Sequence, residues 1–198
     1  KYLKSFVTNI IRENNVESSG FDIEEIHSDR KMIITIERGL DLDPILIPRF
    51  QYGKRRFLSE KKSEVEVELA SENDRFKFKK YKRDLKWENE IWVFLRTKGI
   101  VLHGNNLVFT KESELFRDEP KYGIINWINQ VKEDLEEKGI VVEQSIKETR
   151  YYIGKQELDL KLKMEDDWFD LFATIRFGEF EIPFIRLKKN ILAGKREY

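Results

Sequence analysis

The alternation of apolar and polar residues is most regular near the C-terminus, where it predicts a hairpin, a short third strand and a helix. From residue 157 to residue 164, charged residues alternate with Leu or Met, the period-two pattern of a half-buried strand. Three acidic residues then mark a turn, and a return strand is expected as far as Phe177. Gly178 permits a sharp reversal into a short strand that Pro183 ends. Because a proline at the start of a helix costs no hydrogen bond, a helix with a basic outer face is expected over residues 184–192.

Apolar residues at helical spacing predict three more helices, and alternating patterns predict further strands. The helices are expected at about residues 2–13, 83–98 and 121–138. The strands are expected within residues 32–36, 45–50 and 64–69, with a short hairpin around residues 104–106. Ile140, Val141 and Val142 are expected to begin the last sheet.

Together these elements predict an α+β fold: two small lobes of mostly antiparallel sheet with packed amphipathic helices. The polar stretch of residues 110–120 is the best candidate for a boundary between the lobes. We therefore expect an N-terminal α+β lobe over residues 1–110. A second lobe over residues 111–198 is expected to contain a helix, an antiparallel sheet and the C-terminal basic helix.

The composition limits the classes of function. The 198 residues include 37 Lys and Arg and 37 Asp and Glu, so the net charge predicts no polyanionic partner and any basic site must be local. The absence of cysteine excludes disulfides and thiolate metal sites and is compatible with a cytoplasmic location. Two histidines far apart in the sequence argue against a zinc site. No apolar run approaches the length of a membrane-spanning helix, so we expect no membrane partner.

The sequence lacks the motifs of the common catalytic sites. A phosphate-loop ATPase requires a glycine-rich loop with Lys followed by Ser or Thr, whereas every Gly-Lys pair in this chain is followed by Arg or Gln. Glu157, Asp159 and Lys161 alternate on one strand in the acidic-x-Lys pattern of metal-dependent nucleases. Such residues ordinarily form the solvated face of a strand, and no partner carboxylate is evident. We therefore expect a chain that is not an enzyme and has no cofactor or metal site, with a metal-dependent nuclease as a remote alternative.

Three segments carry an excess of positive charge: residues 49–62, 75–86 and 186–196. In the second segment Lys and Arg alternate with Phe, so a strand would place cations on one face and aromatic rings on the other. Such a face fits weak, sequence-independent contacts with DNA phosphates rather than stacking with bases. A solvated outer face is the ordinary alternative for each segment. The candidate contacts with nucleic acid or a motor are Lys77, Lys79, Lys82, Arg83, Arg186, Lys188, Lys189, Lys195 and Arg196.

Trp168 is a candidate for a contact with another domain. It lies between Asp167 and Asp170 and out of phase with the apolar residues Phe169 and Leu171, which suggests a partly exposed ring. A tryptophan of this kind could serve as an interdomain anchor. Packing beneath a neighbouring helix is the ordinary alternative.

Three runs near the C-terminus resemble a known family. They are Asp-Trp-Phe-Asp at residues 167–170, Arg-Phe-Gly-Glu-Phe-Glu-Ile-Pro-Phe at residues 176–184 and Leu-Ala-Gly-Lys-Arg-Glu-Tyr at residues 192–198. This pattern resembles the region just upstream of the ATPase core in bacterial Swi/Snf-family helicases, the bacterial Swi/Snf helicase-associated domain. The likeness extends to Arg83, Asp84, Trp87 and Glu88, and to residues 127–143.

The resemblance implies a non-catalytic N-terminal accessory region of a bacterial, cytoplasmic ATP-dependent DNA helicase or translocase. Such a region would position the motor or aid nucleic-acid binding. Its partner would be the ATPase motor of the same protein, which would bind ATP and Mg downstream, with weak and non-specific DNA binding as a second contact. We therefore expect the chain to be a piece of a longer protein. The alternative is a protein-protein interaction module without a role in nucleic-acid binding, which would act through Trp168 and the acidic residues 133–137.

Overall fold

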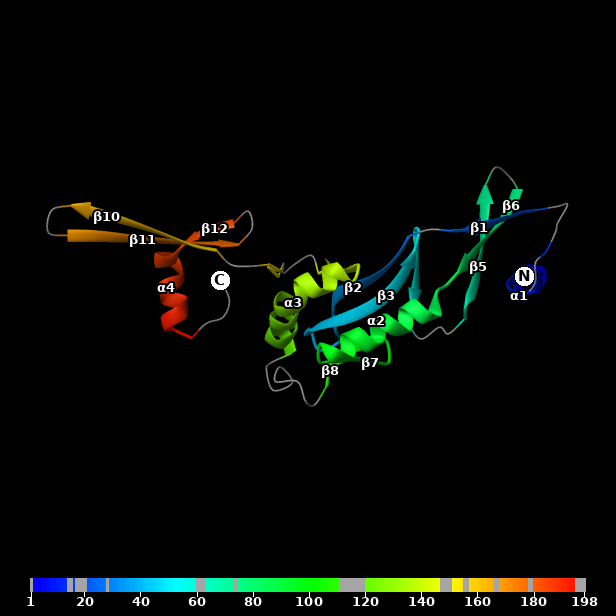
Figure 1. Ribbon diagram of the computed structural model, residues 1–198, viewed down its shortest axis with the longest axis horizontal. Helices are drawn as coiled ribbons and strands as arrows, with labels where there is room; N and C mark the ends of the chain where they lie inside the picture. Colours follow the sequence, from blue (N-terminus) through cyan, green and yellow to red (C-terminus); the bar gives the residue numbers. More distant parts are fainter. Residues whose placement is uncertain are drawn as a thin grey trace.

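Four helices and three sheets make up the described part of the chain, which confirms the α+β class with mostly antiparallel strands and packed helices. The computed structural model describes residues 2–13, 16, 21–27, 29–59, 63–72, 75–110, 120–146, 151–154, 157–165, 168–177 and 180–194. In Figure 1 the three sheets follow one another along the long axis of the molecule.

The central sheet holds the main hydrophobic core. Its strands are β2 (Arg30–Arg38), β3 (Pro44–Tyr52), β4 (Arg55–Leu58), β7 (Ile100–His103), β8 (Asn106–Phe109) and β9 (Ile140–Gln144), in the order β7-β8-β3-β2-β9 with β4 beside β3. Met32 lies opposite Phe50 and Ile36 opposite Leu46, so these four side chains share one face. They form one buried cluster with residues of α2 (Leu85–Thr97) and α3 (Pro120–Glu137), among them Trp127. The two helices therefore cover this face of the sheet.

β9 corrects one expectation from the sequence. Ile140 does not begin the last sheet, because β9 pairs in parallel with β2 and places Ile140 opposite Met32. α3 contacts both β3 and β9. Elements before and after the expected boundary at residue 111 thus belong to one sheet and its helices. The apolar pattern identified the strand correctly, but it carries no information about which distant strand is the neighbour.

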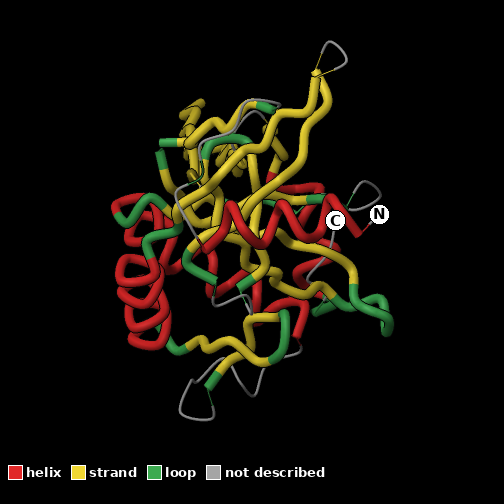
Figure 2. Tube along the Cα trace, turned by 90° about the vertical axis from the view of Figure 1, so that its right-hand side faces the viewer, coloured by secondary structure: helices red, strands yellow, loops and turns green. Residues whose placement is uncertain are grey.

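A second sheet carries the N-terminal helix. β1 (Asp22–Ile26), β6 (Arg75–Lys82) and β5 (Val65–Glu72) form it in that order, with β1 parallel to β6. α1 (Tyr2–Glu13) contacts β5 and β6, and Ile11 of the helix and Phe78 of β6 are almost fully buried. Viewed from the end of the molecule that carries α1, the helix lies across the strands (Figure 2).

The strands and the helix of the C-terminal unit lie where the pattern predicted them. β10 (Glu157–Glu165) and β11 (Trp168–Phe177) form the expected antiparallel hairpin, with Leu158 opposite Ile175 and Leu160 opposite Ala173. β12 (Phe180–Pro183) adds a third strand, and α4 (Phe184–Leu192) follows directly after Pro183. α4 packs against β11 and β12. In Figure 1 this unit lies at the opposite end of the molecule from α1.

A buried ion pair joins the N-terminal sheet to the central sheet. Arg83 lies between the end of β6 and the start of α2, and its side chain is 0% exposed. Its Nε donates to Glu88 Oε1 at 2.9 Å, and its Nη2 donates to Oε2 at 2.6 Å. This bidentate geometry is the strongest form of an arginine–carboxylate contact. The backbone N–H of Arg83 also donates to the carbonyl of Glu64 at 2.7 Å, just before β5.

Tyr52 and Asp84 extend this network from β3 to the start of α2. The Tyr52 hydroxyl donates to Glu88 Oε1 at 2.8 Å and accepts from the backbone N–H of Asp84 at 2.8 Å. Burial raises the pKa of Tyr52 above its ordinary value, so the phenol stays a donor. Asp84 caps α2 by accepting from the backbone N–H of Trp87 at 2.9 Å, and this hydrogen bond lowers the pKa of its carboxyl group. Arg30 donates to the same carboxylate and lies over the Trp87 ring.

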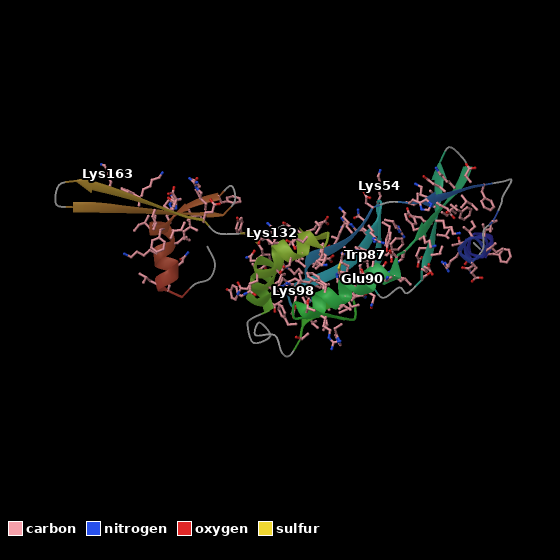
Figure 3. The ribbon with its side chains drawn as sticks, in the orientation of Figure 1. Lys54, Trp87, Glu90, Lys98, Lys132 and Lys163 are labelled. Atoms are coloured by element: carbon pink, nitrogen blue, oxygen red, sulfur yellow. The ribbon has the colours of Figure 1, made fainter. Side chains whose placement is uncertain are left out.

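The buried pair yields a prediction about stability. Glu88→Ala leaves the Arg83 guanidinium buried without its carboxylate and should lower the free energy of unfolding by about 3–5 kcal/mol. Glu90→Ala, two residues further along α2 on an exposed position (Figure 3), is the matched control and should change it by less than about 0.5 kcal/mol. Urea unfolding followed by tryptophan fluorescence measures both variants, since Trp87, Trp92 and Trp127 lie on α2 and α3. Equal unfolding midpoints for the two variants would contradict a stabilising role of the buried pair between Arg83 and Glu88.

Candidate interaction surfaces

The predicted basic contacts do not form one surface. Lys77, Lys79 and Lys82 lie on β6, whereas Arg186 and Lys188 lie on α4, and Figure 1 places these elements at opposite ends of the molecule. The side chain of Lys189 and the residues Lys195 and Arg196 fall outside the part that the structure describes. The predicted basic residues that the structure describes therefore do not form one continuous surface for a nucleic acid.

The prediction that Arg83 contacts a nucleic acid or a motor at the surface was wrong. Its guanidinium is buried and holds Glu88, so it cannot reach a phosphate or a motor. Counting positive charges along a segment does not reveal which of them face inward. The signal that could have found it is the carboxylate five residues later, because an N-capping Asp84 starts a helix that brings Glu88 back towards Arg83.

Carboxylates accompany the cations of β6. The strand register places Lys77 and Lys79 on one face, as the alternation predicted, and puts Lys79 opposite both Glu24 of β1 and Glu68 of β5. Lys77 Nζ lies 3.1 Å from Glu24 Oε2. A polyanion that approached this face would also meet these carboxylates, so the face attracts phosphates weakly.

One shallow hollow next to this face retains an excess of positive charge. It has a volume of about 280 Å³ and is lined by Lys54, Arg55, Glu68, Leu69, Ala70, Lys79 and Tyr81. Among these lining residues, Glu68 carries the negative charge, and its carboxylate accepts a hydrogen bond from Arg55 at 3.1 Å. Lys54 projects at the turn after β3 (Figure 3). Lys54 and Arg55 lie in the first basic segment, but the sequence did not single them out, because their convergence with Lys79 comes from the packing of two different sheets.

The C-terminal unit exposes apolar side chains on both its sheet and its helix. None of its described side chains between residues 157 and 194 is buried. The exposed fractions are 58% for Leu158, 55% for Leu160, 62% for Phe180, 70% for Ile185 and 77% for Leu192. A concentration of exposed apolar groups in one small unit is typical of an interaction surface. We call the side chains of Ile185, Lys188 and Leu192 the outer face of α4, since their spacing of three and four residues places them on one side of the helix.

Trp168 begins β11, but its side chain is among those that the structure does not describe. Its role as an interdomain anchor therefore stays a prediction. The acidic residues of α3 are partly engaged within the fold, since Asp134 Oδ2 accepts from Lys98 Nζ at 2.5 Å and Glu136 lies 4.0 Å from Lys132.

The residues of the nuclease alternative lie in a setting of ion pairs. Asp159 Oδ2 lies 3.8 Å from Lys161 Nζ and 3.8 Å from Arg176 Nη2. Within the described ranges there is no group of three His, Cys, Asp or Glu residues that could hold a metal ion.

The helices of these ranges include none that is long and apolar enough to cross a membrane.

The positive hollow yields a prediction about DNA binding. If Lys54, Arg55 and Lys79 each replace one counterion, affinity for a short duplex should fall roughly 40-fold between 50 and 200 mM salt. Fluorescence anisotropy across a salt series measures this slope. Lys54→Ala combined with Lys79→Ala should flatten it, while Lys188→Ala on the exposed side of α4 serves as the control and should not. A preference for one DNA sequence, or a slope that the double variant leaves unchanged, would contradict the prediction.

Comparison of the chain with protein-family models, with curated proteins and with solved structures finds no match.

Proposed function

We propose that this chain is a non-catalytic accessory module that docks against a protein surface, and that this surface belongs to a Swi/Snf-type ATPase motor. The observation that carries the proposal is the exposure of Ile185 and Leu192 on the outer face of α4, within a unit whose described side chains are all at least partly exposed. The motor as the partner rests on the resemblance of residues 167–198 to the region upstream of that motor.

The chemistry of this outer face favours a protein over a nucleic acid. Two apolar side chains that are more than two-thirds exposed gain free energy when another apolar surface removes them from water. Phosphates offer no such contact. Arg186, next to Ile185, and Lys188, on the outer face itself, are exposed cations that fit acidic groups of a partner surface.

Docking at α4 would position the motor without adding a catalytic group. ATP and Mg would bind to the motor, and the central sheet would act as the rigid support for the docking unit. The hollow at Lys54, Arg55 and Lys79 supports a second, weaker contribution, in which the module contacts DNA phosphates near the motor. An interaction module without a nucleic-acid role would use the same face of α4 for a different protein.

The docking proposal predicts a selective loss of coupling. Ile185→Asp combined with Leu192→Asp, in a protein that carries both this chain and the motor, should lower DNA-stimulated ATP turnover about tenfold or more, because buried apolar anchors dominate interfaces. Val93→Asp is the matched control, since Val93 is an exposed apolar residue on α2, far from α4. Melting of the isolated chain should stay unchanged in both variants, because all three side chains are exposed.

The outcome distinguishes the two candidate partners. Turnover in the double variant that equals turnover in the Val93→Asp variant would contradict docking to the motor and favour the protein-interaction alternative. Lower turnover together with lower melting would instead place these side chains in the fold of the module and remove them as docking residues.

A further inference from the structure

β10 forms one edge of the C-terminal sheet. β10 is the terminal strand in the order β10-β11-β12, and no described strand pairs with its other side. It is nine residues long, whereas the strand at the opposite edge, β12, has four. α4 packs against β11 and β12. A long exposed edge presents a row of backbone donors and acceptors to any strand that can match its side chains.

The side chains of β10 match a second copy of the same strand. In an antiparallel pairing about a two-fold axis at Leu160, Asp159 lies opposite Lys161 of the second copy, and Glu157 lies opposite Lys163. Leu158 lies opposite Leu162 in this register. Every charged residue from 157 to 163 then faces a charge of opposite sign, and every leucine faces a leucine.

Neighbouring registers lose this complementarity. A shift of the axis to Lys161 would place that lysine opposite itself and Glu157 opposite Glu165. A shift to Asp159 would place two aspartates opposite each other. A register that moves one copy by a single residue would set charged residues against leucines. The pattern therefore specifies one axis, at Leu160.

Most of the described side chains that this pairing would engage are exposed, and Asp159 is half-buried. Leu158 and Leu160 are more than half exposed on the apolar face of the hairpin, and the Lys161 side chain is 74% exposed. Asp159 lies 3.8 Å from both of its cationic neighbours, which leaves it beyond hydrogen-bond distance of either. Lys163 lies on β10 towards the outer end of the hairpin (Figure 3).

We propose that two copies of this chain associate through β10 in antiparallel register about Leu160, which joins their C-terminal sheets into one sheet of six strands. Pairing would bring the exposed leucines of both copies together on one face. This inference goes beyond the proposed function, since it concerns the edge of the sheet rather than the outer face of α4.

A charge-swap series tests the pairing. Sedimentation equilibrium of the chain over a range of concentrations should show a monomer–dimer equilibrium. Asp159→Lys and Lys161→Asp should each weaken dimerisation by roughly 30-fold, because each replaces two attractive cross-strand pairs with two repulsive ones. The double variant should restore it. The residues directly opposite these positions on β11 are the uncharged Thr174 and Phe172, and Arg176 of β11, which lies 3.8 Å from Asp159, is unchanged in every variant. Lys188→Asp on α4 is the control and should leave the equilibrium unchanged.

Disulfide capture tests the register. The chain contains no cysteine, so Leu160→Cys introduces a single thiol that should face its counterpart and form a disulfide-linked dimer under mild oxidation. Leu158→Cys places the two thiols roughly 13 Å apart along the strands and should not. Circular dichroism and melting of each variant establish that it is folded.

Several results would overturn the proposal. A chain that stays monomeric at concentrations up to roughly 1 mM has no such association. A dimer that persists in both single variants uses another surface. Failure of the double variant to recover, or disulfide capture of Leu158→Cys in preference to Leu160→Cys, would exclude the register about Leu160.

Discussion

The arrangement of the N-terminal and central sheets depends on the buried pair between Arg83 and Glu88. A guanidinium removed from water is tolerated only when its donors are satisfied, and Glu88 meets it with both carboxylate oxygens. The hydroxyl of Tyr52, at the end of β3, donates to the Glu88 carboxylate. Three elements must therefore be in place together: the end of β6, the start of α2 and the end of β3. The pair therefore acts mainly as a geometric constraint. It fixes how β6 leads into α2 and so where the charged face of the N-terminal sheet lies.

The C-terminal unit contrasts with this constrained part of the molecule. The central core is closed by residues such as Trp127, which is almost fully buried and donates from Nε1 to the carbonyl of Lys98 at 2.8 Å. The connection that leaves this core is also held, because Gly154 N donates to Asn129 Oδ1 at 2.9 Å. Beyond it, the described apolar side chains of β10 to α4 remain partly or largely exposed. A closed core that carries a unit with exposed apolar side chains supports the proposed accessory role, in which another protein surface or a second copy would cover these side chains.

Local patterns predicted the elements well, and long-range pairing accounts for the differences. The hairpin of β10 and β11, the helix after Pro183 and the ends of α2 and α3 before Gly99 and Gly139 follow from period and turn chemistry, and both glycines have a positive φ. The parallel pairing of β9 with β2 could not be predicted, because a strand pattern does not name its partner. The same limit applies to the candidate surfaces. Lys77 and Lys79 were placed correctly on one face, but the carboxylates that accompany them come from β1 and β5, and Lys54 and Arg55 approach Lys79 only through the packing of two sheets.

We propose that α4 carries a docking face for the motor and that the central sheet with its helices supports this face. Amide hydrogen exchange, compared between the isolated chain and a protein that also carries the motor, tests it most directly. Exchange across Phe184–Leu192 should be slower when the motor is present, whereas exchange across Leu85–Thr97, which belongs to the support, should be unchanged. Equal exchange of α4 in the two proteins would contradict it.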